Sequence, residues 1–66
     1  MQIQLNGELR AFTPGLTVAQ LIDELGLSGR RIAVECNEHI VPKSEHGTTR
    51  LADGDRIEIV HAIGGG

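Results

Sequence analysis

The stretch TVAQLIDELGL, residues 17–27, decides the fold, because it predicts one short helix with both of its ends marked. Thr17 suits the N-cap, and Gln20 follows three residues later, as in a capping box. Gly26 suits the left-handed residue that closes a helix. Four apolar residues share one helix face at the i, i+3, i+4 and i+7 spacing: Val18, Leu21, Ile22 and Leu25. A helix with a single apolar stripe must cover another surface.

Alternating apolar and polar residues on both sides of the helix predict the strands of that surface. Five runs show the pattern, over residues 1–5, 8–12, 32–37, 39–41 and 56–63. The pair Asn6-Gly7 between the first two runs favours a tight type I′ hairpin turn. Pro42 ends the fourth strand or confines it to a sheet edge. Residues 43–50 are polar, and we expect them to be irregular.

The element order is therefore ββαβββ, which predicts an α+β roll with one main helix packed on one face of about five strands. The core would be aliphatic, because Phe12 is the only aromatic residue of the chain. We expect the helix to meet a sheet face that holds Ile3, Leu5, Leu9, Ile32, Val34, Ile57 and Ile59. Residues 1–66 would form a single domain, with residues 62–66 as an extended, flexible C-terminal tail.

Size and composition argue against several classes of protein. In a chain of 66 residues, a pocket for a small substrate would consume most of the core, which disfavours a self-contained enzyme. The net charge of −3 and the single aromatic residue disfavour nucleic-acid binding. Cys36 has no partner for an internal disulfide, which fits the cytoplasm. A signal peptide and a membrane span are not expected, because no apolar stretch approaches about 20 residues.

Three consecutive glycines, Gly64, Gly65 and Gly66, stand directly after the last predicted strand. Glycine carries a large entropy cost of ordering and has no side chain to pack, so a structural role is disfavoured. The run offers instead a thin strip of backbone that could thread into another protein's active site. Residues 62–66 would reach at most about 16–18 Å when extended. We interpret the Gly66 carboxylate as the functional group; an inert, floppy terminus is the alternative interpretation.

The chain resembles the ThiS-type sulfur carriers of thiamine biosynthesis, which belong to the ubiquitin-like β-grasp proteins that end in Gly-Gly. The resemblance covers essentially the whole length. It is carried by MQIQLNG at 1–7, TVAQL at 17–21, VPKS at 41–44, LADGDRIEIV at 51–60 and AIGGG at 62–66. The fold that it implies is a ubiquitin-like β-grasp roll with a mixed sheet.

The resemblance also implies a role as a protein cosubstrate rather than an enzyme. An E1-like adenylyltransferase would use Mg-ATP to convert the Gly66 carboxylate to an acyl-adenylate. Sulfur supplied indirectly by a cysteine desulfurase or another donor would then give a thiocarboxylate, which thiazole synthase would use. Gly64 and Gly65 would occupy the partner's channel, and the protein itself would bind no cofactor. The family docks through its open sheet face and the surface around the tail, which here suggests Val60, Ala62, Ile63 and Phe12.

Two other functions remain open at this point. The first is a sister carrier, either the small subunit of molybdopterin synthase or a ubiquitin-related modifier that conjugates to lysines. The second is a β-grasp interaction module, with protein or RNA as its partner, in which the glycines are inert. Removal of Gly65 and Gly66 separates them, because a carrier would lose its activity and a binding module would keep it.

A metal site is not expected, although Cys36 and His39 have Cys-x-x-His spacing. Only two such residues lie near each other in the sequence, whereas a closed zinc site needs four ligands. Cys36 continues the inward-facing set of its strand, so it is interpreted as a small core residue. Burial would raise its pKa and make the thiol inert.

Overall fold

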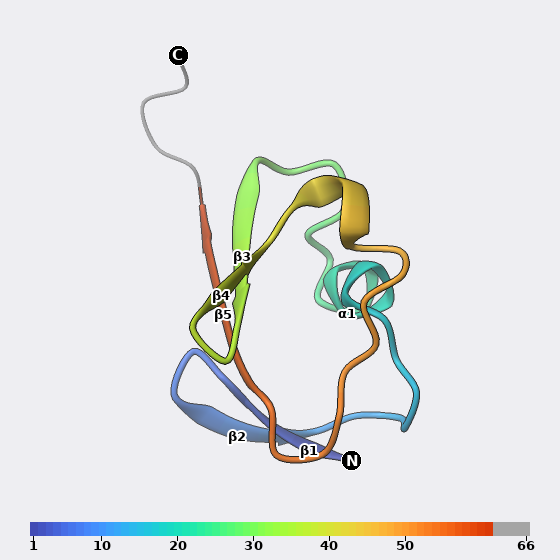
Figure 1. Cartoon of the computed structure of the whole chain (residues 1–66), viewed down its shortest axis with the longest axis vertical. Helices are drawn as coiled ribbons and strands as arrows, with labels where there is room; N and C mark the ends of the chain where they lie inside the picture. The colour runs from blue at the N-terminus through green and yellow to red at the C-terminus, as the bar shows by residue number, and fades with distance from the viewer. Residues whose placement is uncertain (62–66) are drawn as a thin grey trace.

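The structure is a computed structural model that describes residues 1–61, so the predicted tail lies outside the described residues. The strands and the helix follow one another in the predicted order (Figure 1). The elements are β1 Gln2–Leu5, β2 Glu8–Ala11, α1 Val18–Glu24, β3 Ile32–Cys36, β4 His39–Val41, the 3₁₀-helix η1 Lys43–Glu45 and β5 Arg56–His61. The helix η1 lies in the segment that was expected to be irregular.

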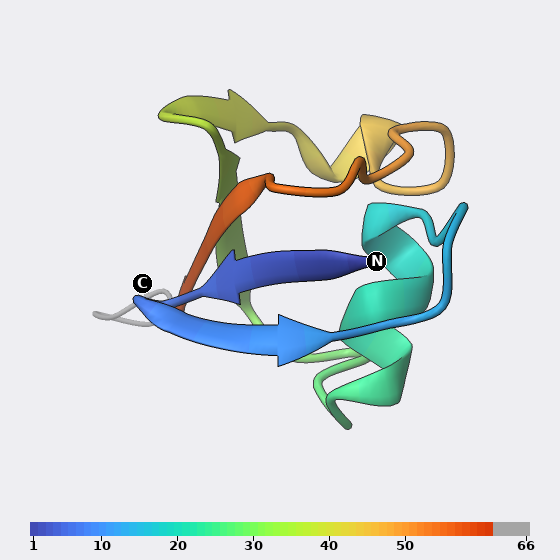
Figure 2. The ribbon, with the colours of Figure 1, turned by 90° about the horizontal axis from the view of Figure 1, so that it is seen from below.

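The strands form a mixed sheet in the order β2-β1-β5-β3-β4. β1 and β5 pair in parallel, whereas the pairs β1–β2, β3–β5 and β3–β4 are antiparallel. The sheet curls around α1, which packs on one of its faces, as Figures 1 and 2 show from two directions. β4 is an edge strand, as expected for a strand that is followed by Pro42. The α+β roll with a mixed sheet is confirmed.

Both ends of α1 have the predicted caps. The Gln20 N–H donates to Thr17 Oγ1 at 3.2 Å, and the Thr17 N–H donates to Gln20 Oε1 at 2.8 Å. At the other end Gly26 has a φ of 73°, and its N–H donates to the Asp23 carbonyl at 3.0 Å. The Leu27 N–H donates to the Ile22 carbonyl at 3.0 Å, which completes a Schellman motif. These local bonds explain why so short a helix has defined ends.

The core is aliphatic, as expected. Its buried members are Ile3, Leu5, Leu16, Val18, Leu21, Ile22, Val34, Val41, Leu51, Ile57 and Ile59. Leu25, Ile32 and Cys36 are partly buried and pack against this cluster. Ile3, Leu21 and Ile57 have no exposed surface, so the stripe of the helix meets the sheet as predicted.

The prediction that Leu9 faces the helix is wrong, because 62% of its surface is exposed. The turn between β1 and β2 has φ values of 51° at Asn6 and 82° at Gly7, which confirms the type I′ expectation. This tight turn sets the register, so that Leu9 pairs with Gln4. Directly paired residues share a face of the sheet, and Gln4 is exposed between two buried neighbours. Leu9 therefore lies on the open face.

Candidate functional site

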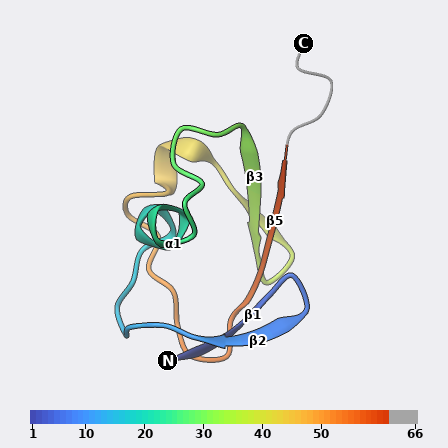
Figure 3. The same cartoon turned by 180° about the vertical axis from the view of Figure 1, so that it is seen from behind.

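β5 is the strand that leads to the predicted tail. Figure 3 shows it side by side with β3, and the pairing runs as far as Ile32 opposite His61. Ile57 and Ile59 point into the core, and Arg56, Glu58 and Val60 alternate with them on the open face. The core therefore packs against one face of β5, and the other face of the strand is open.

Two asparagines in turns form hydrogen bonds to the backbone of β5, one near each end of the strand. Asn6 accepts a hydrogen bond from the Ile59 N–H at 2.8 Å and donates one to the Ile59 carbonyl at 3.2 Å. Asn37 accepts from the Arg56 N–H at 2.9 Å, and its own N–H donates to the Arg56 carbonyl at 2.7 Å. Both asparagines have a φ of 51°. The sequence indicated turns at both places, but not these bonds, because they join residues far apart in the chain.

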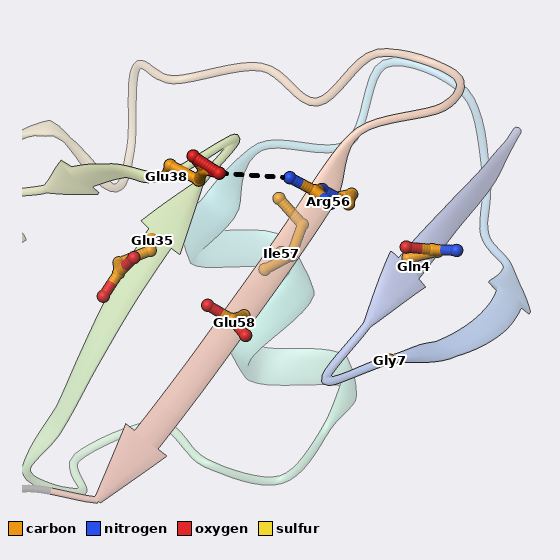
Figure 4. A pocket seen from close by; sticks show the side chains of 7 residues that line it. All are labelled: Gln4, Gly7, Glu35, Glu38, Arg56, Ile57 and Glu58. Carbon is orange, nitrogen blue, oxygen red and sulfur yellow. Dashed lines mark hydrogen bonds and ion pairs between the residues drawn. The ribbon is translucent and has the colours of Figure 1, made fainter.

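The open face carries a group of carboxylates beside β5 (Figure 4). Glu35 and Glu58 stand directly opposite each other in the β3–β5 pair. Arg56, the basic residue beside them, pairs instead with Glu38 at 3.3 Å. These side chains line a surface hollow of about 310 Å³ together with Gln4, Gly7 and Ile57. Sequence reasoning missed this cluster, since it requires the register between two strands.

The hollow suits contact with positively charged side chains rather than the binding of a small substrate. Its walls come from strands and turns and carry three carboxylates, exposed at Glu38 and Glu58 and half-buried at Glu35, and the aliphatic core lies behind it. Opposed like charges on neighbouring strands destabilise a sheet unless a cation lies between them. A guanidinium or ammonium group from a protein partner would supply that cation.

The predicted docking residues fall into three groups. Val60 is 58% exposed on the open face, where it pairs with Ala33. Ala62 and Ile63 lie outside the described residues, as do the tail glycines Gly64, Gly65 and Gly66. Phe12 is partly buried against the core, with the Arg10 guanidinium 5.4 Å from the centre of its ring.

Phe12 and Val60 lie at opposite ends of the sheet. The Phe12 N–H donates to the Met1 carbonyl at 2.8 Å, at the start of β1. Val60 lies beyond the opposite end of β1, because Leu5, the last residue of β1, pairs with Ile57, and Val60 comes three residues after Ile57. Along the strands this separation is about seven residues of about 3.3 Å each. The structure therefore does not join these two residues in one patch, and the docking role of Phe12 stays a prediction.

Cys36 is a partly buried thiol at the end of β3. Burial raises its pKa above the ordinary value of 9.0, and the nearby Asp55 carboxylate raises that pKa further. The Cys36 Sγ donates to Asp55 Oδ2 at 3.7 Å. The expected direction of the pKa shift is confirmed, and the thiol stays protonated near neutral pH, where it is a weak nucleophile.

Two further features are not found in the part of the chain that the structure describes. Among residues 1–61, no three histidine, cysteine or acidic side chains lie close enough together to hold a metal ion. Within the same residues, the helices are too short to cross a bilayer.

Comparison with known proteins places this geometry in a family. The ThiS family model matches residues 3–66, which include the three glycines. The chain is 35% identical over 65 residues to the sulfur carrier protein ThiS of Bacillus subtilis, covering 97% of this chain and 98% of that one. A crystal structure of the thiamine biosynthesis protein ThiS from Geobacter metallireducens has the same fold, with a TM-score of 0.88 at 26% identity over 100% of both chains.

A longer relative combines a similar segment with other sequence. The whole chain is 48% identical, over 66 residues, to part of a thiazole synthase from Paramagnetospirillum magneticum. It spans 20% of the length of that protein. The relative of similar length is named as a carrier rather than as a catalyst. On these matches, the chain has the ubiquitin-like β-grasp fold and belongs to the ThiS family of sulfur carriers.

Proposed function

We propose that this chain carries sulfur on the carboxyl group of Gly66 and delivers it for thiazole formation in thiamine biosynthesis. The observation that carries the proposal is the family match, which extends through the glycines to residue 66. The name of the Geobacter metallireducens protein supports thiamine biosynthesis as the setting. The proposal includes a main chain that ends at Gly66 and a cytoplasmic location.

The chemistry begins by activating a poor electrophile. A nucleophile attacks a carboxylate slowly, because the attack places further negative charge on an anion. An E1-like adenylyltransferase with Mg-ATP would join the Gly66 carboxylate to AMP and release pyrophosphate. The terminal sulfur of a persulfide, supplied through a cysteine desulfurase or another donor, would then attack the carbonyl carbon and displace AMP. A thiol would cleave the resulting S–S bond, become oxidised to a disulfide, and leave the thiocarboxylate.

In this proposal the folded body is the part that the partner recognises. Val60, Ala62 and Ile63 would make apolar contacts with the partner just before the glycines, and the carboxylates Glu35 and Glu58 would face basic side chains of the partner. Phe12 would make a separate contact at the other end of the sheet. Gly64 and Gly65 would enter a channel that is too narrow for a side chain. Residues 62–66 reach at most about 16–18 Å, which suits a recessed active site.

Thiazole synthase is the proposed acceptor of the sulfur. In the Paramagnetospirillum magneticum protein, a segment like this chain and the rest of a thiazole synthase share one polypeptide. Joining a carrier to its acceptor in one chain raises their effective concentration. We infer that the separate chain described here meets a thiazole synthase by diffusion.

Replacing Gly65 with Leu tests the threading step. The variant should keep its fold, because the buried core is built from residues between Ile3 and Ile59. Its adenylation should fall below detection in a pyrophosphate-release assay. Gly47→Leu is the matched control, since a Cβ added at Gly47 would meet no atom within 4 Å and the φ there does not require glycine. Normal adenylation of Gly65→Leu would contradict the narrow channel.

A second experiment distinguishes a sulfur carrier from a binding module. Deletion of Gly65 and Gly66 should abolish adenylation while leaving physical binding to the adenylyltransferase measurable. If the truncated protein still supports thiazole formation in a reconstituted reaction, the Gly66 carboxylate is not the sulfur carrier. If sulfur from the intact protein reaches a molybdopterin precursor or a lysine instead, the sister functions are supported over thiazole formation.

A further inference from the structure

The Asn6 side chain replaces a missing stretch of strand beside β5. The register between β1 and β5 ends at Leu5 and Ile57, and the last backbone hydrogen bond runs from the Asn6 N–H to the Ile57 carbonyl at 2.9 Å, because the chain turns at Asn6. Two residues further along β5, the Asn6 side-chain amide bonds with both the N–H and the carbonyl of Ile59, at 2.8 Å and 3.2 Å. A peptide group of a neighbouring strand would make the same two kinds of bond. The Asn6 side chain therefore extends the hydrogen bonding between the β1 hairpin and β5 as far as Ile59.

This contact fixes β5 on both sides close to its end. On the other side, β3 pairs with β5 as far as His61. Ile59 lies two residues before His61, the last described residue, so the Asn6 amide acts near the point where the strand ends. A strand that is hydrogen-bonded on both sides keeps one direction, whereas a strand that is bonded on one side can twist away from the sheet. Asn6 therefore helps to set the direction of β5 close to His61, the residue that precedes the predicted tail.

We propose that Asn6 is the positioning residue that sets the direction in which the glycine tail leaves the domain. This inference rests on the proposed function. The Asn6 amide bonds to the backbone of β5, just beyond the end of the β1–β5 ladder, whereas Val60 and the carboxylates project from the open face. Losing the amide should therefore impair entry of the tail into the partner's active site after docking. The docking step itself should be little affected.

Asn37 provides a matched control for Asn6. It also occupies a turn with a φ of 51°, and its side chain also bonds to the β5 backbone, but at Arg56, where the strand begins. Glycine tolerates this φ at either position, so Asn6→Gly and Asn37→Gly each remove one amide and keep the turn accessible. Both variants should lose stability to a similar extent, which circular dichroism during thermal unfolding would check. Only Asn6 acts at the tail end of the strand.

Steady-state adenylation separates positioning from docking. We expect Asn6→Gly to lower kcat about tenfold with little change in KM for the carrier, because the partner must fix a strand end that the carrier no longer fixes. Asn37→Gly should change kcat by less than about twofold. Equal losses of kcat in the two variants would overturn the proposal. A raised KM with unchanged kcat in Asn6→Gly would overturn it as well, by assigning Asn6 to docking.

A milder variant keeps the test decisive if Asn6→Gly unfolds the domain. Asn6→Asp retains an acceptor for the Ile59 N–H but loses the donor to the Ile59 carbonyl, so we expect a smaller fall in kcat than for Asn6→Gly. Asn37→Gly stays its control, because Asn37→Asp would place a carboxylate against Asp55, whose Oδ1 accepts from Asn37 Nδ2 at 3.0 Å. Amide hydrogen exchange at Ile59 gives a readout without the enzyme. It should accelerate in Asn6→Gly, which loses the acceptor of the Ile59 N–H, and much less in Asn6→Asp, which keeps an acceptor, or in Asn37→Gly. Unchanged exchange at Ile59 in Asn6→Gly, or an unchanged kcat in Asn6→Asp, would contradict the inference.

The two proposals fail in different ways. If the wild-type protein is not adenylated by an otherwise active partner, the proposed function fails, whatever the hydrogen exchange shows. If the wild-type protein is adenylated and the Asn6 and Asn37 variants behave alike, the proposed function stands and the positioning role of Asn6 fails.

Discussion

The two faces of the sheet differ in chemistry although the same strands build both. The covered face consists of aliphatic residues packed on α1, and Ile3, Leu21 and Ile57 are fully buried there. The open face carries the exposed apolar residues Leu9, Ile40 and Val60, with carboxylates between them. The contrast teaches that stability is concentrated on one side of the sheet. The other side tolerates an unfavourable charge pair, Glu35 opposite Glu58.

The largest effect on stability should come from the covered face. Leu21→Ala removes a fully buried side chain from the middle of the helix stripe and should lower the free energy of unfolding by about 2–5 kcal/mol. That is a large part of the about 5–15 kcal/mol typical of a domain. Leu9→Ala, on the open face, is the control with the same chemical change. Urea unfolding that gave equal losses for the two variants would contradict the division between the faces.

The next largest effect should be on partner recognition from the open face. Val60→Asp places a charge where apolar contact is proposed, and it should raise the KM for adenylation about tenfold while leaving thermal stability nearly unchanged. Leu9→Asp is the comparison variant, because Leu9 is similarly exposed but lies on the edge strand β2. A normal KM in Val60→Asp would remove this residue from the docking surface.

The smallest effect concerns the opposed carboxylates. Glu58→Gln removes the repulsion between Glu58 and Glu35, so the isolated domain should gain about 0.2–1 kcal/mol of stability at low ionic strength. The gain should shrink in about 1 M salt, where charges are screened within about 3 Å. Glu8→Gln is the control, since Glu8 pairs with Leu5 rather than with a carboxylate. A gain that did not depend on salt would indicate a cause other than charge.

Local features of the fold could be predicted from the sequence. The caps of α1 and the Asn6-Gly7 turn depend on residues a few positions apart, so their signals are contained in short windows. The face on which Leu9 lies could not be obtained in that way. It depends on the register of the hairpin, and a shift of one residue moves a side chain to the other face.

The candidate site was only partly accessible to sequence reasoning. The glycine run can be read directly from residues 64–66. The exposure of Val60 follows from the alternation of apolar and polar residues along the last strand. The bonds between Asn6 and Ile59 join residues 53 positions apart, and the pair of Glu35 with Glu58 needs the antiparallel register of β3 and β5. No short pattern encodes such contacts. The direction of the Cys36 pKa shift was predictable because alternation alone placed that thiol toward the core.

The most direct test of the central claim is the mass of the intact protein after incubation with its adenylyltransferase, Mg-ATP and a sulfur source. We predict a product in which one oxygen atom is exchanged for one sulfur atom, and fragmentation should place that change on Gly66. A sulfur atom found on Cys36, or an unchanged mass when the partner enzymes are demonstrably active, would contradict the account.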